Sequence, residues 1–352
     1  MDETLLHIIE AGTRAPSGDN SQPWSFTVSR DAIELTIHPE RDHALLNVRA
    51  GGTLIACGAA IENMAAAARA AGLECEVTLP DDIADPVRLV FSPGSPATAD
   101  ELARAAAIAT RHTNRTAYAT TPLPDEFVRT SVSLTQYAAC RVAFIAGREK
   151  LAQSAHAASA MEEAALGSEQ LHRLFFDSLL FSRAPHEAGQ PGLHLSTMEL
   201  PPPVRLLFRL LRSWRVVRFL DRFGFARLAA AGNAATYASS GALIAFIVPD
   251  RRPLSMIAAG RAMQRVWLDA VSRGLAAQPL AGLLYLAAAL RERSDICPAP
   301  AAARVRDAEA TLYRIAGASG DEVLAMLLRV GVPASPPTDY SRRLPPAITT
   351  RP

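Results

Sequence analysis

Two short segments of the sequence combine residue types that could hold an anionic ligand. The first is Arg111-His112-Thr113-Asn114-Arg115, which places two guanidinium groups, an imidazole and a hydroxyl within about one turn after a predicted helix. Guanidinium groups donate paired hydrogen bonds to phosphate oxygens, and this does not require a basic protein. A solvated helix end whose charges complement the helix dipole is the alternative. The residues alone leave both interpretations open.

The second segment is RAPSGDNSQPW at residues 14–24, which joins small polar side chains to a rigid turn. Pro16 fixes one backbone angle and Gly18 frees another, so Ser17 and Asn20 could be held in one geometry around a flat ligand. A well-capped surface turn fits these residues equally well. Trp24 provides an aromatic anchor in either case.

Weaker candidates lie in three other places. The segment GLAAQPLAG at 274–282 contains Pro279, Leu280, Ala281 and Gly282 and has the composition of an ordinary proline turn after a helix. Arg343 lies in a polar tail, where a solvated arginine is the common finding. His186 and His194 fall in a segment at 183–203 that lacks periodicity; it is expected to be a loop, in which they could touch a substrate or simply be solvated.

No metal site is predicted. The four cysteines are far apart, without a C-x-x-C pair, and are expected to be reduced and mostly buried. No H-E-x-x-H, G-x-S-x-G or Walker-type motif is present, which removes the main support for hydrolase and nucleotide-hydrolysing functions.

The elements that must position these residues follow from hydrophobic periodicity. Helical patterns cover residues 3–13, 53–71, 99–112, 150–166 and 257–275, and another helix opens near 125. Strands are expected at 24–28, 32–38, 75–79, 87–92, 140–146 and 241–249, the first two forming a hairpin around Ser29 and Arg30.

An internal repeat relates two of these helices. Residues 58–73 align with residues 260–275 at a constant offset of 202, with Gly58 over Gly260 and Gly72 over Gly274. Such matches also arise by chance between alanine-rich helices, but in both copies a strand candidate lies beside the helix. We therefore expect an α+β fold of two pseudo-symmetric halves, each with a mixed or antiparallel sheet flanked by helices.

The motifs together resemble the nitroreductase superfamily. Residues 15–24 match its A-P-S-x-x-N-x-Q-P-W segment, and Arg111, Thr113 and Arg115 match its R-R-[ST]-x-R phosphate clamp, with His112 in place of the second arginine. Residues 274–282 resemble its G-L-x-x-x-P-x-x-G turn, with Ala281 where many members carry an acid. SRRLP resembles its C-terminal arm, in which Arg343 is the positional match.

The order of the motifs, with LIACGAA at 54–60, is similar to the Acg-like tandem nitroreductases, in which one chain holds both halves. The resemblance implies one FMN. It assigns Arg111, His112, Thr113, Arg115 and Arg343 to the phosphate, with His112 the least secure of them. Pro16, Ser17 and Asn20 are assigned to the ring, and the backbone at Pro279–Gly282 to the flavin N5 edge. It divides the chain into halves at 1–100 and 101–352, with a lid insertion at about 170–232.

Composition limits the partners. The 36 basic and 35 acidic residues give a net charge of +1, which provides no general field for nucleic acid. The two longest uncharged runs are interrupted by polar residues or proline, and the five arginines between 205 and 218 are expected to form an exposed basic face whose apolar side packs on the core or a partner. We expect no membrane association, a cytoplasmic location suggested by the acidic start, and a monomer or homodimer.

The resulting prediction is an FMN-dependent oxidoreductase that transfers hydride or electrons to an electron-poor organic acceptor, with NAD(P)H as a possible donor and small molecules as substrates. Two alternatives stay open. One is a flavin-binding or flavin-sequestering protein with a lidded FMN and no turnover. The other is a membrane-associated interaction protein acting through the basic segment at 205–218.

Overall fold

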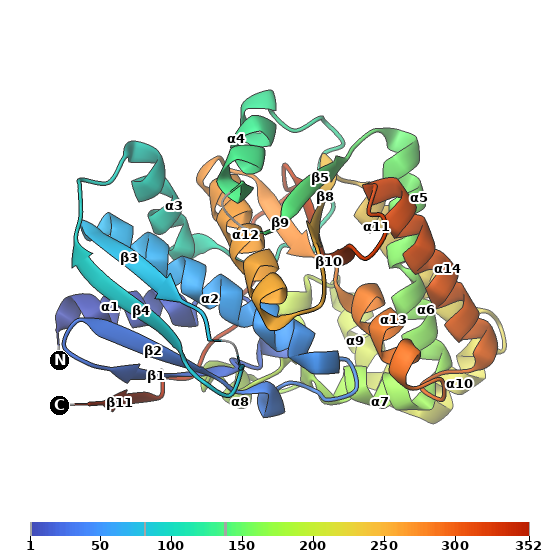
Figure 1. The fold of residues 1–352 in the computed structure, drawn as a ribbon. Helices are drawn as coiled ribbons and strands as arrows, with labels where there is room; N and C mark the ends of the chain where they lie inside the picture. The colour runs from blue at the N-terminus through green and yellow to red at the C-terminus, as the bar shows by residue number, and fades with distance from the viewer. Residues whose placement is uncertain (1, 81, 137–138, 352) are drawn as a thin grey trace.

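The computed structural model describes residues 2–80, 82–136 and 139–351 and contains two main sheets with helices packed between and around them (Figure 1). The first sheet has the order β11-β1-β2-β4-β3, and the second has the order β5-β8-β10-β9. In the first, β11 is parallel to β1 and the other pairs are antiparallel. In the second, all pairs are antiparallel. The α+β prediction with mixed and antiparallel sheets is confirmed.

The first sheet contains the predicted hairpin and the two strands predicted after it. Its strands are β1 (Trp24–Val28), β2 (Ala32–Ile37), β3 (Leu73–Thr78) and β4 (Val87–Pro93). Buried residues alternate with half-buried ones along most of β1 and β2, because successive side chains of a strand point to opposite faces and only one face meets the core. The C-terminal strand β11 (Ile348–Thr350) joins this sheet from the far end of the sequence, and the two termini lie on the same side in Figure 1.

The second sheet contains strands β5 (Arg141–Ile145), β8 (Ala242–Val248), β9 (Ala276–Pro279) and β10 (Val323–Gly331). Both β8 and β10 are buried along their whole length, because helices cover both faces of this sheet. Strand β9 falls within the segment for which the residues alone predicted a proline turn. Pairing with β10 places it at the edge of the sheet, where a proline is tolerated.

Helices α2 (Gly51–Ala70) and α12 (Pro253–Ser272) cross at the centre of the molecule (Figure 1). A Cβ on Gly58 would lie 2.2 Å from the Ile257 carbonyl oxygen, and a Cβ on Gly260 would lie 2.1 Å from the Ile55 carbonyl oxygen. The two glycines that the sequence repeat aligns are therefore the residues that let the two backbones meet. This reciprocity is what a two-fold relation between halves would produce, while a boundary at residue 100 stays a prediction.

Polar side chains continue the α2–α12 contact. The Gln264 amide donates to Asn63 Oδ1 at 2.7 Å, and the buried Glu62 carboxylate pairs with Arg261 and Arg265. Buried polar groups are costly unless paired, so these contacts fix the register of two otherwise alanine-rich helices. The helix predicted at 53–71 and the one at 257–275 are both confirmed.

The remaining helices surround this centre. They are α1 (Glu3–Thr13), α3 (Ala99–Thr110), α4 (Asp125–Thr135), α5 (Arg148–Ala158), α6 (Ala160–Gly167), α13 (Gly282–Glu292) and α14 (Ala299–Ala316). The single helix expected at 150–166 is wrong in one respect, because it is divided at Ser159, whose hydroxyl bonds back to the His156 carbonyl. The pattern did not reveal α13 or α14.

The lid, residues 170–232, is mostly helical rather than irregular. It contains most of α7 (Glu169–Asp177), α8 (Arg183–Glu187), α9 (Pro202–Leu211), α10 (Trp214–Asp221) and the start of α11 (Phe225–Ala238). The expected loop at 183–203 is wrong in part, since α8, η4 (Leu195–Met198) and a two-stranded parallel pair, β6 (Leu179–Leu180) with β7 (Leu193–His194), lie in or beside it. A cluster around Phe176, Leu211 and Val217 gives the lid its own small core.

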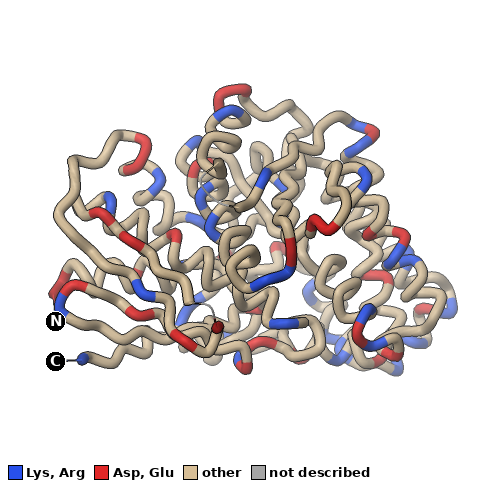
Figure 2. Tube along the Cα trace, in the orientation of Figure 1, with Lys and Arg blue, Asp and Glu red and all other residues tan. Residues whose placement is uncertain are grey.

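The expectation for the basic segment holds only in part. Leu211 and Val217 pack inward, but several large apolar side chains of α9 to α11 remain exposed: Leu206, Leu210, Phe219, Phe223 and Leu228. Basic and acidic residues are otherwise interspersed along the trace (Figure 2). Among the described residues, no helix combines the length and hydropathy needed to cross a membrane.

Candidate cofactor site

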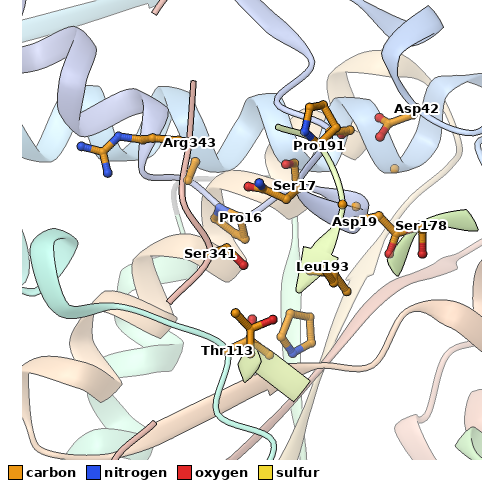
Figure 3. A pocket seen from close by; sticks show the side chains of 18 of the residues that line it. Pro16, Ser17, Asp19, Asp42, Thr113, Ser178, Pro191, Leu193, Ser341 and Arg343 are labelled. Atoms are coloured by element: carbon orange, nitrogen blue, oxygen red, sulfur yellow. The ribbon is translucent and has the colours of Figure 1, made fainter. Parts of the chain in front are cut away.

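A cavity of about 1340 Å³ lies where the loop after α1, the segment after α3, the start of α13, the lid and the tail meet. The tail is defined here as residues 333–346, between β10 and β11. Figure 3 shows Pro16 and Ser17 near the middle of the cavity, Arg343 on one side of them, and Asp19 and Asp42 on the other. Lid residues Pro191 and Leu193 also line the cavity and are labelled in the same view.

The structure brings together all but one of the predicted site residues. Those that line the cavity are Pro16, Ser17, Asn20, Arg111, His112, Thr113, Arg115, Pro279, Ala281, Gly282 and Arg343. They come from four segments separated by up to about 330 residues of sequence. Leu280 is the exception, because it is buried behind the wall and its N–H donates to the Leu327 carbonyl at 2.8 Å. Its backbone donor is therefore already used within the second sheet.

The loop at 14–24 is hydrogen-bonded to both the lid and the tail. Asn20 and Gln22 adopt left-handed backbone angles, with φ of 58° and 51°, and the Gln22 N–H bonds the Ser17 hydroxyl at 3.1 Å. The Gln22 amide then donates to the Gly189 carbonyl at 2.9 Å and accepts from the Leu344 N–H at 2.8 Å. Gln22 belongs to the matched motif, but no feature of the motif predicted that it joins the lid to the tail.

Arg111 is a half-buried cation with unused hydrogen-bonding capacity. Its guanidinium stacks over the Trp267 ring at 4.4 Å and donates to the Arg14 carbonyl at 2.9 Å. Its Nε is buried with no hydrogen-bond partner. Burial lowers the pKa of Arg111 to about 10, so the group stays charged at neutral pH but at a cost. An anion in the cavity would relieve that cost.

His112 adds a second unpaired donor or acceptor. Its Nδ1 lies 2.8 Å from the Thr110 carbonyl oxygen, whereas its Nε2 is buried without a hydrogen-bond partner. The ring meets Tyr340 of the tail edge-to-face, with 5.2 Å between centroids. Burial, and next the charge of Arg111, lower its pKa, so the neutral ring is favoured at pH 7.

Arg115 does not join Arg111. Its backbone N–H bonds the Glu199 carboxylate, and its guanidinium donates to the Thr197 carbonyl at 2.7 Å. Both partners belong to the lid, and Glu199 itself has a left-handed φ of 55°. The two arginines that the sequence placed in one clamp thus have different neighbours, and Arg115 ties the wall of the cavity to the lid.

Arg343 of the tail lies near Arg14 instead. The pKa of Arg343 is lowered by burial and by the nearby charge of Arg14, whose carbonyl is the one that Arg111 binds. Like charges at short range repel unless an anion lies between them. Arg14, Arg111 and Arg343 all line the cavity and are together called its positive wall; Arg14 was not predicted as a site residue.

The start of α13 contributes backbone donors. Ala281 is the N-cap residue and Gly282 the first helical residue, and both line the cavity. The first N–H groups of a helix have no intrahelical partner and carry a partial positive charge. A Cβ on Gly282 would lie 3.0 Å from the Met161 side chain, so little room is left on that side.

Two carboxyls of the cavity were not predicted. Burial is the main cause that raises the pKa of Asp19 and of Asp42 above the ordinary aspartate value. The Thr53 hydroxyl donates to Asp42, which holds that carboxyl at the end of α2. Asp19 lies in the motif segment, whereas Asp42 lies beyond β2, so only their position in the fold identifies them as cavity residues.

Several proteins of Mycobacterium tuberculosis are similar to this chain in sequence. No protein-family model matches the chain. "Uncharacterized protein MT1398" of Mycobacterium tuberculosis is 26% identical over 345 residues, covering 96% of this chain and 46% of that protein. "Putative NAD(P)H nitroreductase Rv3131" of the same organism is 30% identical over 124 residues, covering 35% of this chain and 36% of that protein. "Putative NAD(P)H nitroreductase acg" is 29% identical over 137 residues, covering 37% and 41%. The chain spans about half, or less, of the length of these curated relatives.

Solved structures with a similar arrangement share little sequence. A nitroreductase with bound FMN from Desulfitobacterium hafniense has 13% identity and a TM-score of 0.37, covering 69% of this chain and 94% of that one. The FMN-dependent nitroreductase NfnB from Mycobacterium smegmatis, in complex with NADPH, has 17% identity and a TM-score of 0.36, covering 67% and 90%. The likeness in sequence, not these superpositions, is what relates the chain to other proteins.

Proposed function

We propose that this member of the nitroreductase superfamily is an FMN-dependent oxidoreductase that passes electrons through bound FMN to an electron-poor organic acceptor. The observation that carries the proposal is the positive wall of the cavity. There the half-buried Arg111 and His112 line the cavity, and each has one side-chain nitrogen without a hydrogen-bond partner. Buried polar groups are normally paired, and a phosphate is the ligand that would pair these.

The residues of the cavity fit FMN. Arg111, Arg343 and Arg14 would hold the phosphate, with His112 as a hydrogen-bonding neighbour and the Thr113 hydroxyl nearby. Pro16, Ser17 and Asn20 would lie against the ring system on the opposite loop. A volume of about 1340 Å³ leaves room for the cofactor and for a small substrate, since ligand pockets commonly measure ~300–1,000 Å³.

When bound, FMN supplies hydride and single-electron transfer, and the protein contributes position and electrostatics. The N–H groups at Ala281 and Gly282 would stabilise negative charge at the electron-rich edge of the ring, as donors at a helix N-terminus do. Asp19, whose pKa is raised by burial, is the carboxyl best suited to hold a proton in the cavity. The lid limits the access of water.

NAD(P)H is the proposed electron donor, on the strength of the names of the related nitroreductases. Anaerobic addition of NADPH, and separately of NADH, to the purified flavoprotein tests this. Loss of the flavin absorbance near 450 nm at a saturable rate supports an oxidoreductase. A flavin that neither nucleotide reduces, although dithionite reduces it, contradicts the proposal.

A second candidate, sequestration of FMN without turnover, is favoured by one observation. The lid and the tail both cross the cavity and are joined through Gln22, so a bound flavin would be covered from two sides. The two functions differ in access: a sequestering protein should exclude nicotinamides while holding FMN with slow release. The same anaerobic experiment, together with the rate of FMN release, distinguishes them.

A further inference from the structure

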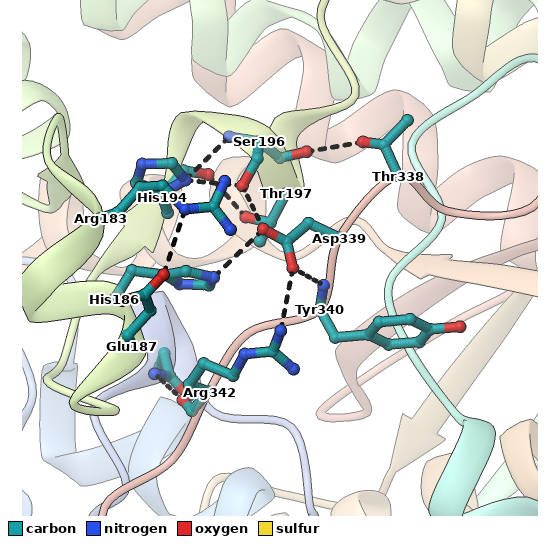
Figure 4. A network of polar contacts seen from close by, with 11 residues as sticks. Arg183, His186, Glu187, His194, Ser196, Thr197, Thr338, Asp339, Tyr340 and Arg342 are labelled. Carbon is teal, nitrogen blue, oxygen red and sulfur yellow. Dashed lines mark hydrogen bonds and ion pairs between the residues drawn. The ribbon is translucent and has the colours of Figure 1, made fainter.

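Three potential metal ligands from distant parts of the sequence converge where the lid meets the tail. They are His186 of α8, His194 of β7 and Asp339 of the tail, and one ligand atom from each lies within 4.8 Å of the others (Figure 4). The sequence suggested two solvated loop histidines. Instead, His186 is 3% exposed and His194 is 9% exposed.

The cluster is buried but incompletely paired. His186 Nε2 lies 3.3 Å from Asp339 Oδ2, yet this nitrogen has no hydrogen-bond partner of acceptable geometry. The two imidazole rings are stacked, with 4.8 Å between centroids and 22° between planes. The stacked arrangement therefore leaves His186 Nε2 buried beside the Asp339 carboxylate without a hydrogen bond. A buried nitrogen of this kind normally has a partner.

Two imidazoles and one carboxylate are a ligand set that Zn²⁺ uses, with water in the fourth position. Metal–nitrogen and metal–oxygen bonds of about 2 Å place ligand atoms on one ion at roughly 3–3.5 Å from each other. The pair formed by His186 and Asp339 already has this separation. The ligand atom of His194 lies up to 4.8 Å from the others and must approach by up to about 1.3–1.8 Å.

Ser196 accounts for the remaining separation. Its hydroxyl lies 2.6 Å from His194 Nδ1 and 2.6 Å from Asp339 Oδ2, and so occupies the space between these two groups. Rotation of the serine side chain would let both groups reach one ion. The hydroxyl could then donate to the carboxylate from outside, as groups behind metal ligands commonly do.

We propose that His186, His194 and Asp339 bind one divalent transition-metal ion, with Zn²⁺ the preferred ion, and that this ion fastens the lid to the tail. The tail is also held near this point by the Thr338 hydroxyl, which donates to the Ser196 carbonyl at 2.8 Å, and by the Asn20 amide, which donates to the Arg342 carbonyl at 2.8 Å. Asp339 also organises its own turn, through the Tyr340 N–H and Arg342. An ion there would hold Arg343 in the wall of the cavity, although the metal site itself does not depend on the identity of the cofactor.

The test uses the full chain, purified without a histidine tag and dialysed against a chelator. Zn²⁺ is titrated in competition with a chromogenic chelator. We expect one equivalent to bind with submicromolar affinity, at least 100-fold weaker binding in the His186→Gln/His194→Gln double variant, and at least 10-fold weaker binding in Asp339→Asn. The control is His156→Gln, an exposed histidine of α5, which should bind as the wild type does.

Wild-type protein that takes up no stoichiometric Zn²⁺, or a double variant that binds it equally well, overturns the proposal. A second measurement needs no variant: hydrogen exchange of the wild-type protein with ZnCl₂ or with MgCl₂. Zn²⁺ should slow exchange at least 10-fold in residues 186–199 and in the tail, with little change in α14. Absence of this localised protection, when Zn²⁺ is bound, places the ion elsewhere and contradicts the assignment.

Discussion

Replacement of Arg111 by methionine separates a cofactor role from a structural one. The side chain lines the cavity, stacks on Trp267 and leaves Nε unpaired. Arg111→Met keeps most of the buried volume and removes the charge. If the guanidinium binds the FMN phosphate through two charge-assisted hydrogen bonds, each worth about 1.5–3 kcal/mol, the loss of about 3–6 kcal/mol weakens FMN binding by at least about 100-fold.

The stability of the FMN-free protein should respond differently. Lowering of the Arg111 pKa from 12.5 to about 10 by burial corresponds to a penalty of about 3 kcal/mol on the charged form. The stacking on Trp267 and the bond to the Arg14 carbonyl offset part of it. We therefore expect the free energy of unfolding of FMN-free Arg111→Met to lie within about 1 kcal/mol of the wild type.

Both quantities can be measured on the same preparations. FMN affinity is obtained from quenching of flavin fluorescence, and the free energy of unfolding from urea denaturation of the FMN-free protein. Arg104→Met is the matched control, because Arg104 lies on α3, which ends just before Arg111, pairs with Asp269 at 3.7 Å and lies outside the cavity lining. An Arg111→Met protein that binds FMN normally but loses several kcal/mol of stability would refute the phosphate role and make Arg111 a structural residue.

Three further predictions concern the frame around the site. Gly58→Ala forces a Cβ to 2.2 Å from the Ile257 carbonyl oxygen and should lower the free energy of unfolding in urea by about 3 kcal/mol. The control Gly232→Ala lies in open space on α11 and should be neutral or stabilising by up to ~1 kcal/mol. Equal effects of the two changes would contradict the close crossing of α2 and α12. Gly189 has a φ of 70°, and a Cβ added there would lie 2.1 Å from the Arg343 carbonyl carbon, so Gly189→Ala should displace the tail. FMN release should then be at least 10-fold faster in a stopped-flow exchange assay, while the control Gly167→Ala should leave the rate unchanged. Slow release from both variants would show that the lid–tail crossing does not retain the flavin. Hydrogen bonding to Arg141 lowers the pKa of Glu322 from 4.5 to about 2, so the contribution of Glu322 to stability is complete above pH 4.5 and lost as the pH falls toward 2. Glu322→Gln should therefore be less stable than the wild type by about 0.5–1 kcal/mol at pH 7 and equal to it near pH 2. A loss of stability that does not depend on pH would contradict this.

Local sequence signals predicted most of the elements but only part of the site. The hairpin at β1 and β2 and the helices α2 and α12 follow from periodicity, and the offset that aligned Gly58 with Gly260 identified the residues at which the helices cross. The helices of the lid were partly missed, because proline and glycine between 185 and 203 interrupt any period even where short helices form.

Contacts between distant segments could not be derived from local pattern. Arg111 and Arg115 lie four residues apart and match one motif, yet the first turns to Trp267 and the second to the lid. The meeting of His186 and His194 with Asp339 spans about 150 residues and depends on the path of the tail. Arg14 entered the positive wall because the motif loop and the tail happen to converge there, which only the fold determines.

The central claim is that this cavity holds FMN, and the absorbance spectrum of the purified protein tests it most directly. We expect the protein, either as purified or after incubation with FMN, to show flavin maxima near 370 and 450 nm. Denaturation should then release about one FMN per chain. A colourless protein that also fails to retain added FMN on gel filtration would contradict the account. The unpaired nitrogens of Arg111 and His112 would then need another anion as their partner.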